Sequence, residues 1–266
     1  MIIPTRSFDD YLRQAVNSCL AELALLPDDA LGEVIVVVDG PAMNAFPAWV
    51  RDKRVRVLVL GVHRGTPVAL NVGLNSSEAT YIARLDSDDV AEPARLSKAV
   101  EYLEAHENVV AVGTQGYLID PDGAEIGCLD MPVGRANVKR SLLRRNSLIH
   151  SSVVFRREAM LRVDGYDEDC LRMQDYDLFL RLALVGDLDN LSGRLINYRV
   201  HGGMSSKATS PYRVYTRRVL ASRYSLYRAS GHGRFSGFAH NTLWWVAQVL
   251  RHHGLRRPRY LGRASN

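Results

Sequence analysis

The sequence predicts an α/β domain built on a doubly wound, mostly parallel β-sheet. Two observations carry this prediction. Over roughly the first 110 residues, short apolar runs typical of strands alternate with segments whose apolar residues recur at helical spacing. In addition, Val34–Val38 is a continuous β-branched run, which is typical of a strand buried on both faces of a parallel sheet.

Each element expected in this half follows from a local pattern. Ile2 and Ile3 start a very short first strand that Pro4 interrupts, and Ser7 is the expected N-cap of the first helix. Strands are expected at Val34–Val38, Val55–Leu60, Tyr81–Leu85 and Val109–Val112. Helices are expected at Tyr11–Leu23, at Pro67–Leu74 and from Glu92-Pro93 onward, where proline suits a first helical turn.

The second half is less regular. Pro121-Asp122-Gly123 predicts a hairpin turn. The other expected elements are a basic helix at Arg135–Arg145, a strand at Ser152–Phe155 and a helix from about Gln174 to Leu184. No linker is visible before about Gly202, so we expect one domain over residues 1–206 and an extension over residues 207–266.

Composition excludes several protein classes. The chain has 266 residues, of which 47% are hydrophobic and 24% are charged, as in globular rather than disordered or collagen-like proteins. Three dispersed cysteines without a C-x-x-C spacing favour a reducing compartment over a disulfide framework or a zinc ribbon. No signal peptide is visible, and no apolar run approaches the roughly 20 residues of a membrane span. A soluble or peripheral protein is expected.

Acidic residues follow two of the expected strands. Asp39 comes directly after Val34–Val38, and Asp86 comes directly after Tyr81–Leu85. In doubly wound sheets ligands bind at the carboxyl ends of the strands. The sequence therefore predicts a ligand site at this edge of the sheet.

The segment Ala83–Val90 carries the strongest local signal. Asp86, Asp88 and Asp89 place three carboxylates in four positions, where they repel one another unless a cation neutralises them. Oxygen ligands of this kind suit Mg²⁺ or Mn²⁺. The alternative is that Asp88 or Asp89 caps the following helix while the other carboxylates are solvated.

Other polar segments each leave two interpretations open. Asp39 could accept hydrogen bonds from a base or ribose, or cap a turn. Arg64, at the start of a helix, could meet a diphosphate or belong to a plain basic loop. Asp175 and Asp177 straddle a helix start, where capping accounts for one of them. Arg199 and His201 share a face of a strand before Gly202-Gly203, although lone histidines are usually structural.

Charge is distributed unevenly along the chain. The net charge is +5, yet residues 211–266 hold eleven arginines and no lysine or acidic residue, which leaves −6 for residues 1–210. The terminal segment could lie on an anionic membrane, with Trp244-Trp245, Arg251, Arg256 and Arg257 at the interface. It could instead pack on the acidic body, also as part of a homodimer interface. Nucleic-acid binding is not expected, because no recognised motif accompanies the arginines.

Taken together, these segments resemble glycosyltransferase family 2, with its GT-A nucleotide-sugar fold. The resemblance covers Ile2 to about Ser206. It rests on these motifs, in the family's order: I-I-P-T, V-V-V-D, R-G-T-P-V-A-L-N-V-G-L, A-R-L-D-S-D-D, H-S-S-V-V-F-R-R, G-Y-D-E-D, Q-D-Y-D-L-F-L-R-L and Y-R-V-H. The family resemblance implies a mixed Rossmann-like sheet flanked by helices and an inverting, metal-dependent sugar transfer. The donor would be a nucleotide-diphosphate sugar, most often a UDP-sugar. The acceptor would be a glycan or glycolipid in bacterial cell-surface polysaccharide synthesis, at the cytoplasmic face of the membrane.

The resemblance also implies roles for individual residues. Asp175 would be the general base, and Asp88, Asp86 and His201 would hold Mn²⁺ or Mg²⁺. Contacts to the nucleotide sugar would come from Pro4, Thr5, Asp39, Arg64, Asn71, Asp86, Arg199 and His201. Two departures from the family pattern are Gly40-Pro41 after Asp39, in place of Asp-Gly-Ser, and Gln174 in place of glutamate before Asp175.

Two rival functions share this fold. One is a nucleotidyltransferase-like enzyme, although Pro4–Ser7 lacks the glycine-rich basic loop that such an enzyme needs after its first strand. The other is a non-catalytic, membrane-associated glycan-binding scaffold. A dinucleotide oxidoreductase is disfavoured because no G-x-G-x-x-G follows a strand.

Overall fold

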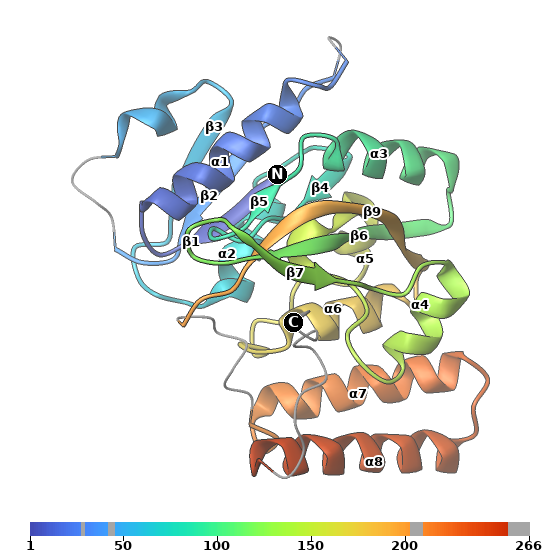
Figure 1. The fold of residues 1–266 in the computed structure, drawn as a ribbon. Coiled ribbons are helices and arrows are strands. Elements are labelled where there is room, and N and C mark those ends of the chain that lie inside the picture. Colours follow the sequence, from blue (N-terminus) through green and yellow to red (C-terminus); the bar gives the residue numbers. More distant parts are fainter. Residues whose placement is uncertain (28–29, 42–45, 203–209, 255–266) are drawn as a thin grey trace.

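The computed structural model describes residues 1–27, 30–41, 46–202 and 210–254. Figure 1 shows a central sheet with helices on both faces and two long helices, α7 and α8, stacked at one side. The predicted α/β class is confirmed. None of the helices in the described part of the chain is long and apolar enough to cross a bilayer.

The N-terminal strands form a parallel sheet. Its order is β1 (Ile2–Thr5), β2 (Val34–Val38) and β3 (Val55–Val59). All five residues of β2 are buried, as its β-branched run predicts. Helix α1 (Asp10–Leu23) connects β1 to β2, helix α2 (Thr66–Asn75) follows β3, and both pack on these strands.

The expectation that Pro4 interrupts the first strand is wrong. Pro4 lies within β1, opposite Val37 of β2. The carbonyls of Met1 and Thr5 accept hydrogen bonds from the β2 side. Because alternate residues of a strand bond to opposite neighbours, Met1 and Thr5 face β2 and Pro4 faces the other way. The missing N–H of Pro4 therefore costs no hydrogen bond between β1 and β2.

The second sheet has the order β4-β8-β6-β9-β5, with β7 paired to β6. Its strands are β4 (Tyr81–Ala83), β5 (Val90–Ala91), β6 (Val109–Ile119), β7 (Glu125–Leu129), β8 (Val154–Arg156) and β9 (Asp187–Arg199). Only β6 and β9 run parallel, and an isolated parallel bridge from Ile2 to Arg84 joins the two sheets. The expected hairpin between β6 and β7 is confirmed, but β6 extends beyond the expected Val109–Val112, and the sequence predicts no bounds for β9.

The remaining helices of the body are α3 (Arg95–Ala105), α4 (Arg135–Leu142), α5 (Arg157–Arg162) and α6 (Gln174–Leu182), with short 3₁₀ turns η1 (Ala48–Arg51) and η2 (His150–Ser152). Two expected helix starts are corrected. Asp9, not Ser7, caps α1, because its carboxylate accepts a hydrogen bond from Leu12 N at 2.9 Å. Helix α3 begins at Arg95 rather than at Glu92-Pro93.

The C-terminal helices α7 (Val214–Ala229) and α8 (Arg234–His252) pack on the body through α6. Val219, Leu226 and Trp244 join the same apolar core as Phe179 of α6. Of the two tryptophans that the membrane alternative places at the interface, Trp244 is buried in the protein and Trp245 is partly exposed. Trp244 is buried under the Arg223 guanidinium, 4.9 Å from it, and the Trp245 ring N–H donates to Pro211 O at 3.2 Å.

Parts of the sequence predictions fall outside the described residues. These are the boundary between residues 206 and 207 and the arginines at 256 and 257.

Candidate active site

Three aspartates gather where β4 ends. Ligand oxygens of Asp86, Asp88 and Asp89 lie within 4.8 Å of one another. Asp86 and Asp88 are each about one third exposed, at 35% and 32%, whereas Asp89 is buried. The alternative that Asp88 or Asp89 caps the next helix is not what the structure has, since α3 starts at Arg95 without a side-chain cap.

Asp86 is held by two partners on its own side of the cluster. Its carboxylate pairs with the buried Arg84 guanidinium and accepts a hydrogen bond from Ser151 Oγ at 2.8 Å. Ser151 in turn accepts a hydrogen bond from Arg84 Nη1 at 2.9 Å. Burial works against ionisation, but the Arg84 charge outweighs it and holds the pKa of Asp86 below its usual value.

Asp88 and Asp89 are less well compensated. Burial and the nearby Asp86 raise the pKa of Asp88, and burial with both neighbouring carboxylates raises the pKa of Asp89 well above its usual value. Asp88 contacts His201 Nε2 at 2.8 Å. Asp89 accepts from Arg199 N at 2.8 Å, and its other oxygen is buried without a hydrogen-bond donor among the described residues.

This donor set fits a hard divalent cation. Carboxylate oxygens are the ligands that Mg²⁺ and Mn²⁺ prefer. Among the described residues, Arg84 is the only buried guanidinium that forms an ion pair with any of the three carboxylates, and its partner is Asp86. One oxygen of Asp89 accepts no hydrogen bond from these residues. A bound cation would offset the burial and the repulsion that raise the two pKa values, so the residues present suit the metal that the sequence predicts.

Arg199 lies beneath the cluster. Its guanidinium is buried and donates to the carbonyls of Asp88 at 2.8 Å and Pro121 at 2.8 Å and to Gln14 at 2.8 Å. It also stacks 4.6 Å from the Tyr11 ring centroid. The side chain thus holds the backbone that carries Asp88 and Asp89.

Asp175 stands in the first turn of α6, on the other side of the site. Asn146 Nδ2 donates to its carboxylate at 2.6 Å, and Tyr176 N donates at 2.8 Å. Burial raises the pKa of Asp175 despite these hydrogen bonds. Asn146, which binds Asp175, and Ser151, which binds Asp86, belong to the same short segment before β8. The charges of Arg84 and Asp86 also act on the pKa of Asp175, so Asp175 lies near the aspartate cluster.

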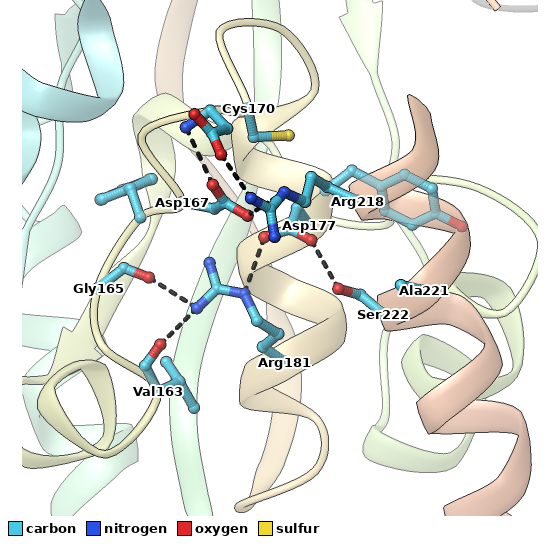
Figure 2. Close-up of polar contacts among 12 residues, drawn as sticks. Val163, Gly165, Asp167, Cys170, Asp177, Arg181, Arg218, Ala221 and Ser222 are labelled. Atoms are coloured by element: carbon cyan, nitrogen blue, oxygen red, sulfur yellow. Dashed lines mark hydrogen bonds and ion pairs between the residues drawn. The ribbon is translucent and has the colours of Figure 1, made fainter. Parts of the chain in front are cut away.

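Asp177, the second acidic residue at this helix start, has a structural environment. It is buried and accepts from Arg181 Nε at 2.8 Å and from Ser222 Oγ of α7 at 2.6 Å. Figure 2 shows these contacts, of which the one to Ser222 joins α6 to α7. Because no side chain caps α6, capping accounts for neither Asp175 nor Asp177.

The residues expected to meet the nucleotide surround the ends of β1 and β2. Asp39 is buried and holds the loop before α2, accepting from Arg64 N at 2.6 Å and Gly65 N at 3.0 Å, with His63 Nδ1 at 2.7 Å. Pro4 and Thr5 end β1, and Thr5 Oγ1 donates to Ser7 O at 2.7 Å. The Arg64 side chain is exposed.

Asn71 has its polar atoms engaged within the protein. Its Nδ2 donates to Tyr166 O at 2.8 Å, and its Oδ1 accepts from Tyr166 N at 2.8 Å. Gly165 sits beside it with φ of 62°, and a Cβ there would lie 2.5 Å from Asn71 Oδ1. This glycine therefore lets the chain pass close to α2 and fixes the loop that leads to α6.

Several site residues were missed by the sequence analysis. Arg84, Ser151 and Asn146 contact the predicted aspartates directly. His150, next to Ser151, contacts Tyr166 Oη at 2.8 Å, and burial together with Arg84 lowers its pKa well below the usual value. Arg84 and Ser151 lie inside the motifs A-R-L-D-S-D-D and H-S-S-V-V-F-R-R, and their place in these motifs could have identified them as site residues.

Comparisons with known proteins identify the family of this chain. The family model for glycosyl transferase family 2 matches residues 1–168. The O-antigen biosynthesis glycosyltransferase WbnJ of Escherichia coli is 32% identical over 220 residues, which cover 80% of this chain and 83% of that protein. The amylovoran biosynthesis glycosyltransferase AmsE of Erwinia amylovora is 27% identical over 223 residues, which cover 82% and 81% of the two chains.

Solved structures show the same fold. S. aureus TarS residues 1–349 in complex with UDP-GlcNAc superposes with a TM-score of 0.67 at 19% identity, covering 96% of this chain and 72% of that one. The superposition therefore extends into the C-terminal helices. With the matching family model and the WbnJ relative, the site geometry leads to one conclusion: this chain belongs to glycosyltransferase family 2 and is a glycosyltransferase with the GT-A fold.

Proposed function

We propose that this enzyme transfers a sugar, with inversion, from a UDP-sugar to a hydroxyl of a glycan or glycolipid in bacterial surface polysaccharide synthesis. The observation that carries the proposal is the pairing of two separate acidic groups at one site, the Asp86–Asp89 cluster and Asp175. One group suits a leaving diphosphate with its cation, and the other suits an attacking hydroxyl. The names of WbnJ, AmsE and a 25% identical Escherichia coli UDP-Gal-dependent β-1,3-galactosyltransferase support the donor and the pathway class.

Asp88, Asp86 and His201 would hold the metal. Asp89 would be a further ligand, because one of its oxygens has no hydrogen-bond partner among the described residues. A bound Mn²⁺ or Mg²⁺ would act as a Lewis acid that offsets negative charge growing on the diphosphate. Arg84 and Ser151 orient Asp86 toward this task. Arg199, given its buried contacts, would position Asp88 and Asp89 rather than touch the donor itself.

Asp175 would act as the general base. As the acceptor oxygen attacks the anomeric carbon in line with the departing phosphate oxygen, its proton passes to the Asp175 carboxylate and the bond to the diphosphate breaks. The raised pKa of Asp175 makes the carboxylate a stronger base than a solvated aspartate. General-base help of this kind contributes about 10²–10⁴-fold.

Donor recognition would fall to the ends of β1 and β2 and to the loop before α2. Pro4 and Thr5 would border the base, and Asp39 would act by holding the loop before α2. The exposed Arg64 side chain would reach toward the diphosphate at the start of α2. Asn71 would act through the loop at Tyr166. We also propose that the catalytic domain is residues 1–206 and that the acceptor is lipid-linked, which would bring the enzyme to the cytoplasmic face of the membrane.

A panel of UDP-, GDP-, dTDP- and CMP-sugars with Mn²⁺ tests the donor class. The donor that binds the native state should raise the melting temperature by mass action. Asp175→Asn should keep this donor-induced shift and lose transfer, by about 10²–10⁴-fold. Turnover of Asp175→Asn at the wild-type rate would contradict the base assignment, and an absence of transfer or hydrolysis with every donor would favour the non-catalytic scaffold.

A further inference from the structure

The outer face of α8 is apolar along its whole length. At 100° per residue, Phe235, Phe238, Ala239, Thr242, Leu243, Val246, Val249 and Leu250 fall within one stripe of about 140°. Phe235 is 93% exposed, Phe238 71% and Leu243 68%. The stripe holds no charged residue. A surface helix of a soluble protein normally presents the opposite pattern, with its polar side outward.

The other face of α8 is the one that packs on the protein. Trp244 is buried against Arg223 and Tyr176, and Asn241 Nδ2 donates to Leu220 O of α7 at 2.7 Å. Gly237 lies against Tyr224, where an added Cβ would come within 3.2 Å of the ring. Helix α8 therefore has two apolar sides, of which only one is used within the described chain, and Figure 1 shows α8 on the far side of α7 from the sheet.

The hairpin of α7 and α8 is fixed on the catalytic body. Arg223 Nη1 donates to Tyr176 Oη at 2.6 Å, beside Asp175. Arg218 pairs with Asp167 at 3.3 Å and with Asp169, and Ser222 donates to Asp177, all between α7 and the segment that leads into α6 (Figure 2). These contacts therefore fix the orientation of the stripe relative to the candidate active site.

The charge of the hairpin that carries the stripe indicates the charge of its partner. Arg218 is exposed but pairs with Asp167 and Asp169. Four other described arginines of the hairpin are exposed, Arg213, Arg217, Arg228 and Arg234, and the chain has no acidic residue after Asp189. A second copy of this chain placed on the stripe would bring two such arginine-rich surfaces together, which like-charge repulsion opposes. An anionic lipid surface satisfies both the apolar stripe and the arginines.

From this geometry we infer that the stripe on α8 is a membrane-docking surface. The helix lies flat in the interface of an anionic bilayer, with Phe235, Phe238 and Leu243 inserted among the acyl chains and the arginines on the lipid headgroups. This surface goes beyond the proposed sugar transfer and is measured without any donor or acceptor.

Vesicle co-sedimentation of the full chain tests the inference. We expect binding to phosphatidylglycerol-containing vesicles that weakens as salt rises, and little binding to pure phosphatidylcholine vesicles. The triple variant Phe235→Ser/Phe238→Ser/Leu243→Ser should bind phosphatidylglycerol vesicles at least tenfold more weakly. The matched control is Leu31→Ser/Ile126→Ser/Leu161→Ser, which changes three exposed apolar residues elsewhere and should bind as the wild type does.

Two outcomes would overturn the inference. The first is equal vesicle binding by the wild type and the triple variant, including no binding by either. The second is a dimer of the wild type in light scattering that the triple variant dissolves, because a second copy would then cover the stripe. Phe235→Ser alone, at a side chain 93% exposed, provides a milder variant if the triple variant folds poorly.

The docking test is independent of the proposed reaction. Transfer to a water-soluble acceptor should be unchanged in the triple variant, since none of its three residues contacts the site. If Asp175→Asn retained full transfer while the stripe variant lost vesicle binding, the proposed function would fail and the docking surface would stand.

Discussion

Two sets of acidic side chains in this protein differ in how well their oxygens are hydrogen-bonded and paired with positive charge. Glu22 is fully buried, and its two oxygens accept from Arg95 Nε at 3.0 Å, Arg95 Nη2 at 2.8 Å and Leu96 N at 2.9 Å. Asp177 is likewise satisfied by Arg181 and Ser222. Asp88 and Asp89, by contrast, lie beside a third carboxylate and have raised pKa values.

The difference separates structural acids from functional ones. A buried carboxylate with a full set of donors and a counter-charge is stabilised in place and has no capacity left for a ligand. A carboxylate kept near like charges is destabilised until a cation or proton arrives. Substitutions at the two sets should therefore affect opposite properties, stability for the first and activity for the second.

The largest effect is expected at the buried ion pair. Glu22→Gln leaves the Arg95 guanidinium buried without its counter-charge, and Arg95 Nη1 also donates to the carbonyls of Arg84 and Ser151. The free energy of unfolding should fall by about 3–5 kcal/mol. Denaturant titration measures this, and Glu33→Gln, whose partner Arg56 is half exposed, should cost at most about 1 kcal/mol. Equal losses in the two variants would contradict the comparison.

Asp88→Asn should have the reverse profile. Transfer should fall by on the order of 10²–10³-fold, as expected for losing part of a cation site. The free energy of unfolding should stay the same or rise, because the substitution removes a charge that its neighbours repel. Asp122→Asn, in the exposed β6–β7 turn, makes the same change in net charge and should affect neither quantity. A large loss of stability in Asp88→Asn would show that Asp88 stabilises the fold rather than binding a cation.

Asp177→Asn tests the anchor between α6 and α7. An amide there keeps one acceptor but no longer matches both Arg181 and Ser222, so a loss of about 1–3 kcal/mol in unfolding free energy is expected. The pair of Asp187 with Arg135, at 3.7 Å and 41% and 47% exposed, supplies the control Asp187→Asn, with little effect. If Asp187→Asn lowered the unfolding free energy as much as Asp177→Asn does, burial would not explain why the Asp177 contacts stabilise the protein.

The sequence predicts the elements whose determinants are local. The β-branched run of β2 and the start of α6 at Gln174 are found where expected, and the clustered aspartates follow β4. The extent of β9 could not be predicted, because its polar stretch becomes a strand through pairing with β6 on one side and β5 on the other. Tertiary pairing overrides local propensity there.

The same limit applies to the site. Asp86 and Asp175 are visible as residues, but their partners Ser151 and Asn146 are 65 and 29 positions away. Whether a carboxylate is satisfied depends on such distant donors. Asp177 and Asp175 share one helical turn and differ only in what the fold places opposite them, so periodicity alone cannot tell the anchor from the proposed base.

The smallest effect concerns the pH profile of Asp175. Burial raises its pKa, and the Asn146 amide, 2.6 Å away, favours the ionised form. Because a general base works only when deprotonated, activity should decline as the pH falls through this raised pKa. Asn146→Ala removes a donor to the carboxylate and raises the pKa further, so the acidic limb of the kcat profile should move to higher pH, by less than about one unit.

Asn137→Ala is the matched control for this profile, since that amide donates only to Val133 O at the start of α4. Its acidic limb should coincide with that of the wild type. A limb that stayed in place in Asn146→Ala, or moved to lower pH, would show that the titrating group is not Asp175. Catalysis would then depend on a carboxylate whose charge Asn146 does not stabilise. The different environments of Asp177 and Asp175 would in that case not distinguish a structural carboxylate from the general base.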